Sequence, residues 1–389
     1  MTSNEQLFDA LLRHQVGLLR LSGSIRKRIF AVLDQADSAV LDRLVARLGR
    51  PDPRLSPMTL LRLARLSKII KQIRLDAWKE VAGIWGEEMH ALVKSEPAFV
   101  AGAMQTVLPV YVDFVTPPAE LLRSIVTRRP FQGRVLREWA SHQSRTDIQR
   151  INGQIRVGMI QGDSIQTIGR RVRGGMKMSR RDAEAITRTA VNHYSNQARR
   201  EFVEANKSVI TTEMIVATLD GNTTAICRSL DGRRFKAGVG PIPPFHFGCR
   251  TLRTALVDPE PTGLRPMKPI HQKQMLREFA QQKRISVPRS RNKLPYGMKT
   301  QFDKFARGRT REMIGRVPAR VNYQEWLGRQ PVQFQNDTLG VTKARLFRDG
   351  KLPLKKFVDR RGHELTLTQL ARVERQSFID AGLDPEKFL

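Results

Sequence analysis

Apolar residues recur at helical spacing through most of the first half of the chain. In SGSIRKRIFAVLDQADSAVLDRLVARLG (residues 22–49) they lie three or four positions apart, which places them on one face of a helix. Ser24 is suited to cap the start of this helix, and Gly49 and Pro51 are suited to end it. The spacing predicts a second long helix from Ser56-Pro57 to an interruption at Pro97. The chain therefore begins with long amphipathic helices.

The helical pattern continues to about residue 205. Thr116-Pro117-Pro118 predicts the start of a shorter helix, and Asp163-Ser164 predicts the cap of another. Ser179, with Asp182 three positions later, predicts the start of a further long helix, which carries His193. A single histidine within a helix is more often packed or solvated than a ligand.

At residue 209 the pattern changes to one typical of strands. VITTEMIVATLD is rich in β-branched residues and ends at the turn signal Asp220-Gly221-Asn222. A second turn at Asp231-Gly232 precedes a short strand, and residues 250–257 form a third. The predicted class is α+β, with a mostly helical N-terminal half and a small antiparallel β unit whose turn-rich loops hold the Cys and His residues.

The last third of the chain divides into two parts. Residues 258–320 are rich in Lys and Arg with repeated Pro and Gly, which favours an extended basic linker or arm. Residues 321–389 return to short helices separated by Gly340 and Gly350, with a final helix that begins near Thr366 or Thr368. The predicted regions are 1–129, 130–257, 258–320 and 321–389.

Charge limits the choice of partner. Lys plus Arg is 68 and Asp plus Glu is 37, so the formal net charge is +31. Such an excess favours a polyanion, first nucleic acid and second an anionic membrane, although a basic solvated surface remains open. Aromatic residues are only 6% of the chain, which favours sequence-independent contacts to phosphates over base stacking. The predicted DNA contacts in the basic segment are Arg289, Arg291, Lys293, Arg307, Arg309 and Arg311.

Membrane insertion and a disulfide framework are both disfavoured. No apolar run approaches the roughly 18 residues that a spanning helix needs. The first residues, MTSNEQLFDALLRHQ, lack the order of a secretory signal. Two cysteines in 389 residues fit a reducing compartment rather than a disulfide scaffold.

One ordered set of short motifs resembles a known family. ATLDGNTTAICRSLDGRRF is followed by PPFHFGCRT, and an Arg-Thr pair lies upstream in a predicted helix. Together these resemble the phage Mu F-like head-morphogenesis family of minor head proteins. The matching residues are Arg188-Thr189, Asp220, Cys227, Leu230-Asp231-Gly232, Pro243-Pro244, His246 and Cys249-Arg250. The tail resembles such proteins at Tyr323, Trp326, Gln330, Leu339-Gly340 and ELTLTQL.

The resemblance implies a structural, non-enzymatic phage protein. It would be a minor head component that associates with the portal during capsid assembly, with the major capsid or scaffolding protein as a further partner. It would lie inside the head of the virion near the portal vertex, and in the host cytoplasm during assembly. Double-stranded DNA would be contacted without sequence preference. The helical region 1–129 is expected to bind the portal, because amphipathic helices offer apolar stripes to a partner.

Cys227, His246 and Cys249 allow three interpretations. They can hold a structural zinc ion, with Asp220, Asp231 or a water as fourth ligand. They can form a catalytic Cys-His pair, although no third, orienting group is evident. They can also be packing residues only. Many family members carry a further cysteine where this chain has Thr224, so the resemblance does not supply four ligands.

On the packing interpretation the neighbouring polar residues hold turns. Asp220 and Asp231 would accept backbone N–H bonds, and Gly232 would allow a positive φ. Arg250 would then pair with one of the two carboxylates.

Two rival functions remain open. The first is an enzyme, a nuclease or toxin acting on nucleic acid, for which His363 beside Glu364 is the candidate pair in the C-terminal region. The second is an ejected protein that acts at a membrane surface during genome delivery.

Overall fold

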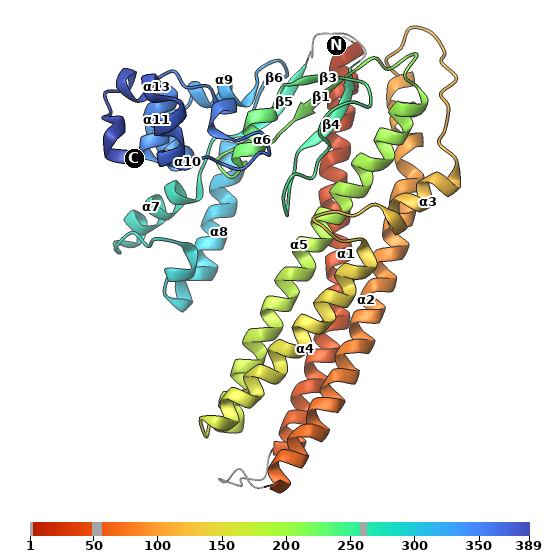
Figure 1. Ribbon diagram of the computed structural model, residues 1–389, viewed down its shortest axis with the longest axis vertical. Coiled ribbons are helices and arrows are strands. Elements are labelled where there is room, and N and C mark those ends of the chain that lie inside the picture. Colours follow the sequence, from red (N-terminus) through yellow and green to blue (C-terminus); the bar gives the residue numbers. More distant parts are fainter. Residues whose placement is uncertain (1–2, 49–56, 257–262) are drawn as a thin grey trace.

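The N-terminal half is a bundle of long helices. The computed structural model describes residues 3–48, 57–256 and 263–389. Helices α1, α2, α4 and α5 run side by side, and the sheets and C-terminal helices gather around one end of them (Figure 1). The helices are α1 (Ser3–Leu48), α2 (Pro57–Gln105), α3 (Ala119–Arg128), α4 (Leu136–Ile160) and α5 (Ile165–Ala205).

Some predicted helix ends are confirmed. Helix α3 begins directly after Pro117-Pro118. Ser164 caps α5, since its side-chain oxygen accepts a hydrogen bond from the Thr167 amide at 3.2 Å. The predicted stop at Gly49 and Pro51 and the predicted cap at Ser56 lie outside the described residues.

Three predicted breaks are wrong, because the helices continue through them. Helix α2 passes through Pro97. Ser24 lies inside α1, where its hydroxyl donates to the Leu21 carbonyl at 2.9 Å. Ser179 lies inside α5, where its hydroxyl donates to Asp147 on α4 at 2.7 Å. Packing along the whole bundle outweighs these local signals.

The four long helices pack together around two hydrophobic clusters, of which the smaller contains Ile168, Val172 and Met176. The larger includes Ile25 of α1, Trp85 of α2, Trp139 of α4 and Tyr194 of α5, all buried. The helices before and after the predicted boundary at residue 129 therefore pack as one unit.

The expected small antiparallel β unit is present. Strands β1 (Thr212–Val216), β3 (Arg234–Lys236) and β4 (Leu252–Leu256) form a three-stranded sheet in the order β3-β1-β4. Val216 lies opposite Leu252 in the β1–β4 ladder. A short helix, α6 (Ala225–Leu230), precedes β3 and had no counterpart in the sequence prediction. The predicted α+β class is confirmed.

The prediction of an extended basic arm is wrong for residues 263–320. Strand β5 (Leu264–Lys268) pairs in parallel with β2 (Leu219–Asp220) and antiparallel with β6 (Gly315–Pro318), which forms a second sheet. Between β5 and β6 lie α7 (Gln272–Lys283), the 3-10 turn η1 (Arg291–Lys293) and α8 (Tyr296–Met313). These fold around Leu276, Phe279 and Phe302. The dense Lys and Arg content obscured these apolar residues. Residues 258–262 lie outside the described part of the chain.

The C-terminal region consists of short helices around its own core. Gly340, with φ +83°, separates α10 from α11. Thr366 caps α12 by accepting a hydrogen bond from the Gln369 amide at 3.2 Å, as predicted. The elements are α9 (Tyr323–Gly328), α10 (Val332–Leu339), α11 (Val341–Arg348), η2 (Leu354–Phe357), α12 (Leu367–Val373), α13 (Arg375–Asp380) and η3 (Pro385–Phe388).

Within residues 3–48, 57–256 and 263–389, none of the helices combines the length and the apolar character that crossing a membrane requires.

Candidate metal centre

Cys227, His246 and Cys249 meet beside the first sheet. Cys227 lies in α6, and the other two lie in the loop that leads into β4. The sulfur of Cys227 is 3.3 Å from Nε2 of His246 and 3.7 Å from the sulfur of Cys249. Both cysteines are buried and His246 is partly buried. Among the described residues, these three side chains lie close enough to one another to share a metal ion.

The spacing matches three corners of a zinc tetrahedron. Zn–S bonds of about 2.3 Å and Zn–N bonds of about 2.0 Å, at tetrahedral angles, place two sulfurs about 3.8 Å apart and a sulfur and nitrogen about 3.5 Å apart. The observed separations are 3.7 Å and 3.3 Å. A disulfide would need its sulfurs at about 2.05 Å, so the two cysteines are free thiols here. These two separations fit a shared zinc ion, and all three ligand atoms lie within 4.8 Å of one another.

The orientation of His246 also suits a ligand. Its Nδ1 lies 2.9 Å from the carbonyl oxygen of Phe247. A carbonyl oxygen can only accept, so Nδ1 carries a proton, and Nε2, which faces Cys227, is the ring atom left for a metal ion. Metal-binding histidines are commonly held in this way by a backbone carbonyl.

The protonation of the group favours one thiolate. A hydrogen bond from Cys227 holds the pKa of Cys249 below its usual range, and a hydrogen bond from His246 adds to this against the opposing effect of burial. The pKa of His246 is raised, chiefly by its hydrogen bond with Cys249. The pKa of Cys227 is raised by Cys249 and by burial. A bound cation would replace the proton on Cys227, because the thiolate is the form that binds metal.

Neither aspartate considered as a fourth ligand is part of the group. Asp220 accepts two hydrogen bonds from the Arg250 guanidinium, at 2.6 and 2.9 Å. Asp231 accepts from Arg265, at 2.9 and 3.0 Å, and from the Tyr323 amide at 2.7 Å. Both carboxylates are committed to arginines, so the prediction of an aspartate ligand is wrong.

Thr224, the N-cap residue of α6, is a further polar neighbour of the group. Its side chain lies beside Cys227 and acts to lower the pKa of that thiol. Its hydroxyl oxygen is buried and has no hydrogen-bond partner of good geometry among the described residues. A water bound to a metal ion would give this hydroxyl a partner, so water is the fourth ligand that best fits the described residues.

The neighbouring turns depend on the same two aspartates. Asp220 accepts from the Asn222 amide at 3.0 Å, and Asp231 accepts from the Ala217 amide at 2.6 Å. Gly232 has φ +77°, a conformation that favours glycine. The ion pair of Asp220 with Arg250 closes the segment between β2 and β4. The pKa of Asp220 is lowered, since the bonds from Arg250 outweigh burial.

Three buried polar side chains of α5 form hydrogen bonds with the backbone of this loop and of β4. Thr189 accepts from the Gly248 amide at 2.9 Å, Asn192 donates to the Thr251 carbonyl at 3.1 Å, and Asn196 accepts from the Arg253 amide at 3.2 Å. Sequence reasoning noted Thr189 only within a motif and missed both asparagines. Their spacing along one helix face was the available signal.

Residues 149–254 match a family described as Phage Mu protein F like protein. This segment is a phage Mu F-like domain. It starts in α4, ends in β4 and contains the Cys-His-Cys group, the Asp220–Arg250 pair and Thr189. The match supports, in general terms, a role in phage head morphogenesis. No curated protein and no solved structure matches the chain.

The predicted DNA-contacting residues differ in their surroundings. Arg291 is paired with Asp303 at 2.6 Å, and Arg309 is paired with Glu278 at 2.9 Å and Glu312 at 2.8 Å. The other four are exposed and form no ion pair with any described residue: Arg289, Lys293, Arg307 and Arg311.

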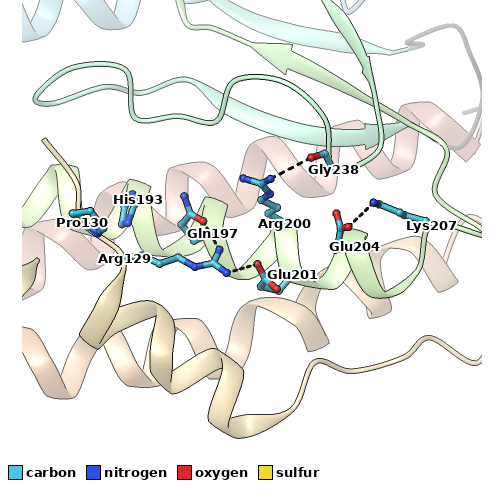
Figure 2. Close-up of a pocket in the computed structure, with 9 residues that line it drawn as sticks. All are labelled: Arg129, Pro130, His193, Gln197, Arg200, Glu201, Glu204, Lys207 and Gly238. Carbon is cyan, nitrogen blue, oxygen red and sulfur yellow. Dashed lines mark hydrogen bonds and ion pairs between the residues drawn. The ribbon is translucent and has the colours of Figure 1, made fainter. Parts of the chain in front are cut away.

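A groove of about 470 Å³ runs along α5 near His193 (Figure 2). Its charges pair with one another: Arg129 donates to Gln197 and Glu201, both at 2.6 Å, and Lys207 bonds to Glu204. Burial lowers the pKa of His193 to about 4. Arg200 donates to the Gly238 carbonyl at 3.4 Å. Each charged side chain of the groove thus has a partner within it, and the buried histidine is neutral.

The candidate enzymatic pair near the C-terminus does not come together. Glu364 pairs with Lys343 at 2.6 Å, while the exposed His363 lies 3.2 Å from Asp359.

Proposed function

We propose that this chain is a non-enzymatic minor head protein that associates with the portal and lies inside the head near the portal vertex. The observation that carries the proposal is the phage Mu F-like match over residues 149–254. Asp220 and Asp231 of that region are committed to turns and to ion pairs with Arg250 and Arg265, which supports a structural role for the Cys-His-Cys region. The portal, the major capsid or scaffolding protein, and packaged DNA are the proposed partners.

The portal contact is assigned to the surface of residues 1–129. The apolar stripes of α1 and α2 are used in the bundle core, so a partner must contact other residues. The connection between α2 and α3 exposes Val110 and Tyr111, which are 64% and 81% accessible. An exposed aromatic beside an aliphatic residue is typical of a protein contact.

Replacing Val110 and Tyr111 together with serine is expected to weaken portal binding at least tenfold, since hot-spot side chains each contribute about 1–2 kcal/mol or more. The measurement is co-purification and titration of the full chain with the portal protein from the same genome. Val287→Ser with Tyr296→Ser is the matched control, because those residues are 56% and 92% accessible and lie outside residues 1–129. Equal loss in both variants, or in neither, would remove the assignment.

For DNA, the proposal is non-specific contact with phosphates by surplus Lys and Arg. The net charge of +31 supports it, because such contacts gain affinity from counterion release. Four of the residues first considered, Arg289, Lys293, Arg307 and Arg311, form no ion pair within the described part of the chain and remain candidates. Arg291 and Arg309 would have to give up carboxylate partners.

For the metal centre, the proposal is a structural zinc ion held by Cys227, His246 and Cys249. It would clip α6 to the loop before β4, in a region with a small core of its own. Zinc held by Cys and His side chains adds its binding free energy to the stability of the folded state.

The purified chain is expected to contain one zinc ion, and Cys249→Ser is expected to lose it. Removal by a chelator should lower the midpoint of thermal unfolding by at least about 5 °C, because ligand binding to the folded state adds to stability. Elemental analysis and thermal melts provide the readouts. His363→Ala, at an exposed histidine, is the control that should retain zinc. Thr224→Cys supplies a third thiolate, and with it a fourth protein ligand, and should slow zinc release. Metal-free protein with an unchanged melt would contradict the proposal.

A further inference from the structure

The first half of α5 carries a row of exposed cations on its outer face. Arg170, Arg173, Lys177 and Arg181 follow one another at spacings of three, four and four residues, which keeps them on one side of the helix. All four are exposed. None of them forms an ion pair with a carboxylate among residues 3–48, 57–256 and 263–389. We call these four residues the α5 ridge.

The ridge lies opposite the buried face of the helix. Ile168, Val172 and Met176 point into the bundle core. The ends of the ridge, Arg170 and Arg181, are eleven positions apart, so it extends about 16 Å along the helix axis. Figure 1 shows this part of α5 along the outer side of the bundle, away from the sheets. The ridge is thus a linear positive surface that no other described element covers.

The carboxylates of this part of the bundle are committed elsewhere. Arg171 pairs with Asp163, Arg180 with Asp34 and Asp37, and Arg150 with Asp182. Arginines beside the ridge are therefore neutralised, while the ridge itself is not. Like charges three or four positions apart destabilise a helix, so the fold gains nothing from leaving these four together.

Gly174 lies on the same face, between Arg173 and Lys177. It is exposed, and an added Cβ would meet no atom within 4 Å. Packing therefore does not require glycine, although glycine weakens a helix relative to alanine. Its absence of a side chain lets a partner approach the helix backbone closely at the middle of the ridge.

The ridge is supported by a rigid base. On the adjoining faces of α5, Ser179 donates to Asp147 of α4, and Arg180 pairs with Asp37 of α1. Those aspartates also hold the buried Arg74 of α2. The four cations thus project from a helix that is fixed against three others, which suits repeated contacts with a regular partner.

We propose that the α5 ridge is a docking surface for the sugar-phosphate backbone of duplex DNA. This inference rests on the proposed function and names the helix that would carry its DNA contact. A straight row of cations matches a line of phosphates, which lie closely spaced along each strand. Residues 165–192 contain no Phe, Tyr or Trp, so the ridge lacks both the rings that stack on bases and the anchors that favour a membrane interface.

Three variants of the full chain test the proposal, and each removes four positive charges by substitution with glutamine. The ridge variant changes Arg170, Arg173, Lys177 and Arg181. The second changes the exposed C-terminal set, Arg289, Lys293, Arg307 and Arg311. The third changes scattered exposed cations of the bundle: Lys79, Lys94, Arg123 and Arg137. Binding to a random-sequence duplex is measured by fluorescence anisotropy across a series of salt concentrations, and circular dichroism checks the fold.

The ridge variant should bind at least about thirtyfold more weakly near 0.1 M salt, and its log–log salt slope should fall by up to about 3.6, because each lost phosphate contact removes about 0.9. The scattered variant should change the slope by less than about 1.

Several outcomes would overturn the proposal. If wild type binds and the ridge variant keeps its affinity and slope, the ridge is not the DNA surface. If only the variant of Arg289, Lys293, Arg307 and Arg311 loses DNA binding, the ridge is again not the DNA surface. If wild type itself ignores DNA at low salt, the proposed DNA contact fails together with the ridge. Loss of binding to anionic vesicles but not to duplex would reassign the ridge to membranes.

Discussion

Replacing Asp231 with alanine is expected to lower the free energy of unfolding by about 3–5 kcal/mol, because it leaves a buried guanidinium without its counterion. The side chain of Arg265 is 2% accessible, and its two terminal nitrogens lie 2.9 and 3.0 Å from the Asp231 carboxylate. The same carboxylate accepts the amide hydrogens of Ala217 and Tyr323. One side chain thus joins the phage Mu F-like domain to β5 and α9.

Chemical denaturation of the full chain measures this effect. Asp231→Ala combined with Arg265→Met should recover much of the loss, since replacing both buried charges avoids the unpaired one. Asp349→Ala is the control, because that residue pairs with Arg348 at the surface and should cost no more than about 1 kcal/mol. A loss below about 1 kcal/mol for Asp231→Ala would show that the pair does not hold the two regions together.

The Asp231 site also shows where sequence reasoning stops. Asp231-Gly232 was predicted as a turn, and the turn is present with Gly232 at φ +77°. The partner Arg265 lay in a segment expected to be an extended arm. A local sequence pattern such as Asp-Gly predicts a turn. The salt bridge between Asp231 and Arg265, 34 positions apart, depends instead on the pairing of β5 in the second sheet. The composition of residues 263–320 concealed the apolar residues that fold it.

In the helices, too, some local hydrogen bonds were predicted correctly and the effects of long-range packing were not. Caps at Ser164 and Thr366 were predicted because a cap is a local hydrogen bond. The predicted break at Pro97 is absent. Proline removes one backbone hydrogen bond from α2, and the packing of α2 against the bundle offsets that loss. Ser179 was predicted to cap a helix, but its hydroxyl donates a hydrogen bond to Asp147 of α4 instead.

At the metal centre, a shared zinc site was one of three interpretations of Cys227, His246 and Cys249, and the structure brings these three side chains together. The sequence did not identify the fourth position, because Asp220 and Asp231 have the right chemistry and differ only in their arginine partners. Asn192 and Asn196 were also missed, since nothing local to α5 shows which loop a buried amide will meet.

Replacing Arg74 with methionine is expected to have a comparably large effect, a loss of about 3–5 kcal/mol in the free energy of unfolding. Arg74 is fully buried and donates to Asp147 and Asp37, each at 2.7 Å. Trp78 also donates to Asp147, at 2.8 Å. Methionine fills the space of the aliphatic stem but leaves the buried Asp147 without its cation and Asp37 with Arg180 alone. Adding Asp37→Asn and Asp147→Asn should restore most of the loss, because neutral amides need no counterion.

The loss caused by Arg74→Met should also depend on pH. Burial raises the pKa of Asp37, and Arg74 and Arg180 oppose that effect. Without Arg74 the pKa of Asp37 rises further, so the folded variant binds a proton that the unfolded chain, with an ordinary aspartate, still releases above about pH 4. A raised pKa in the folded state gives stability that is present at low pH and disappears as pH increases through that pKa. The difference between variant and wild type should therefore be smaller at pH 5 than at pH 8 in urea denaturation. A difference that is constant or grows on acidification would mean that Arg74 does not balance buried charge in this bundle.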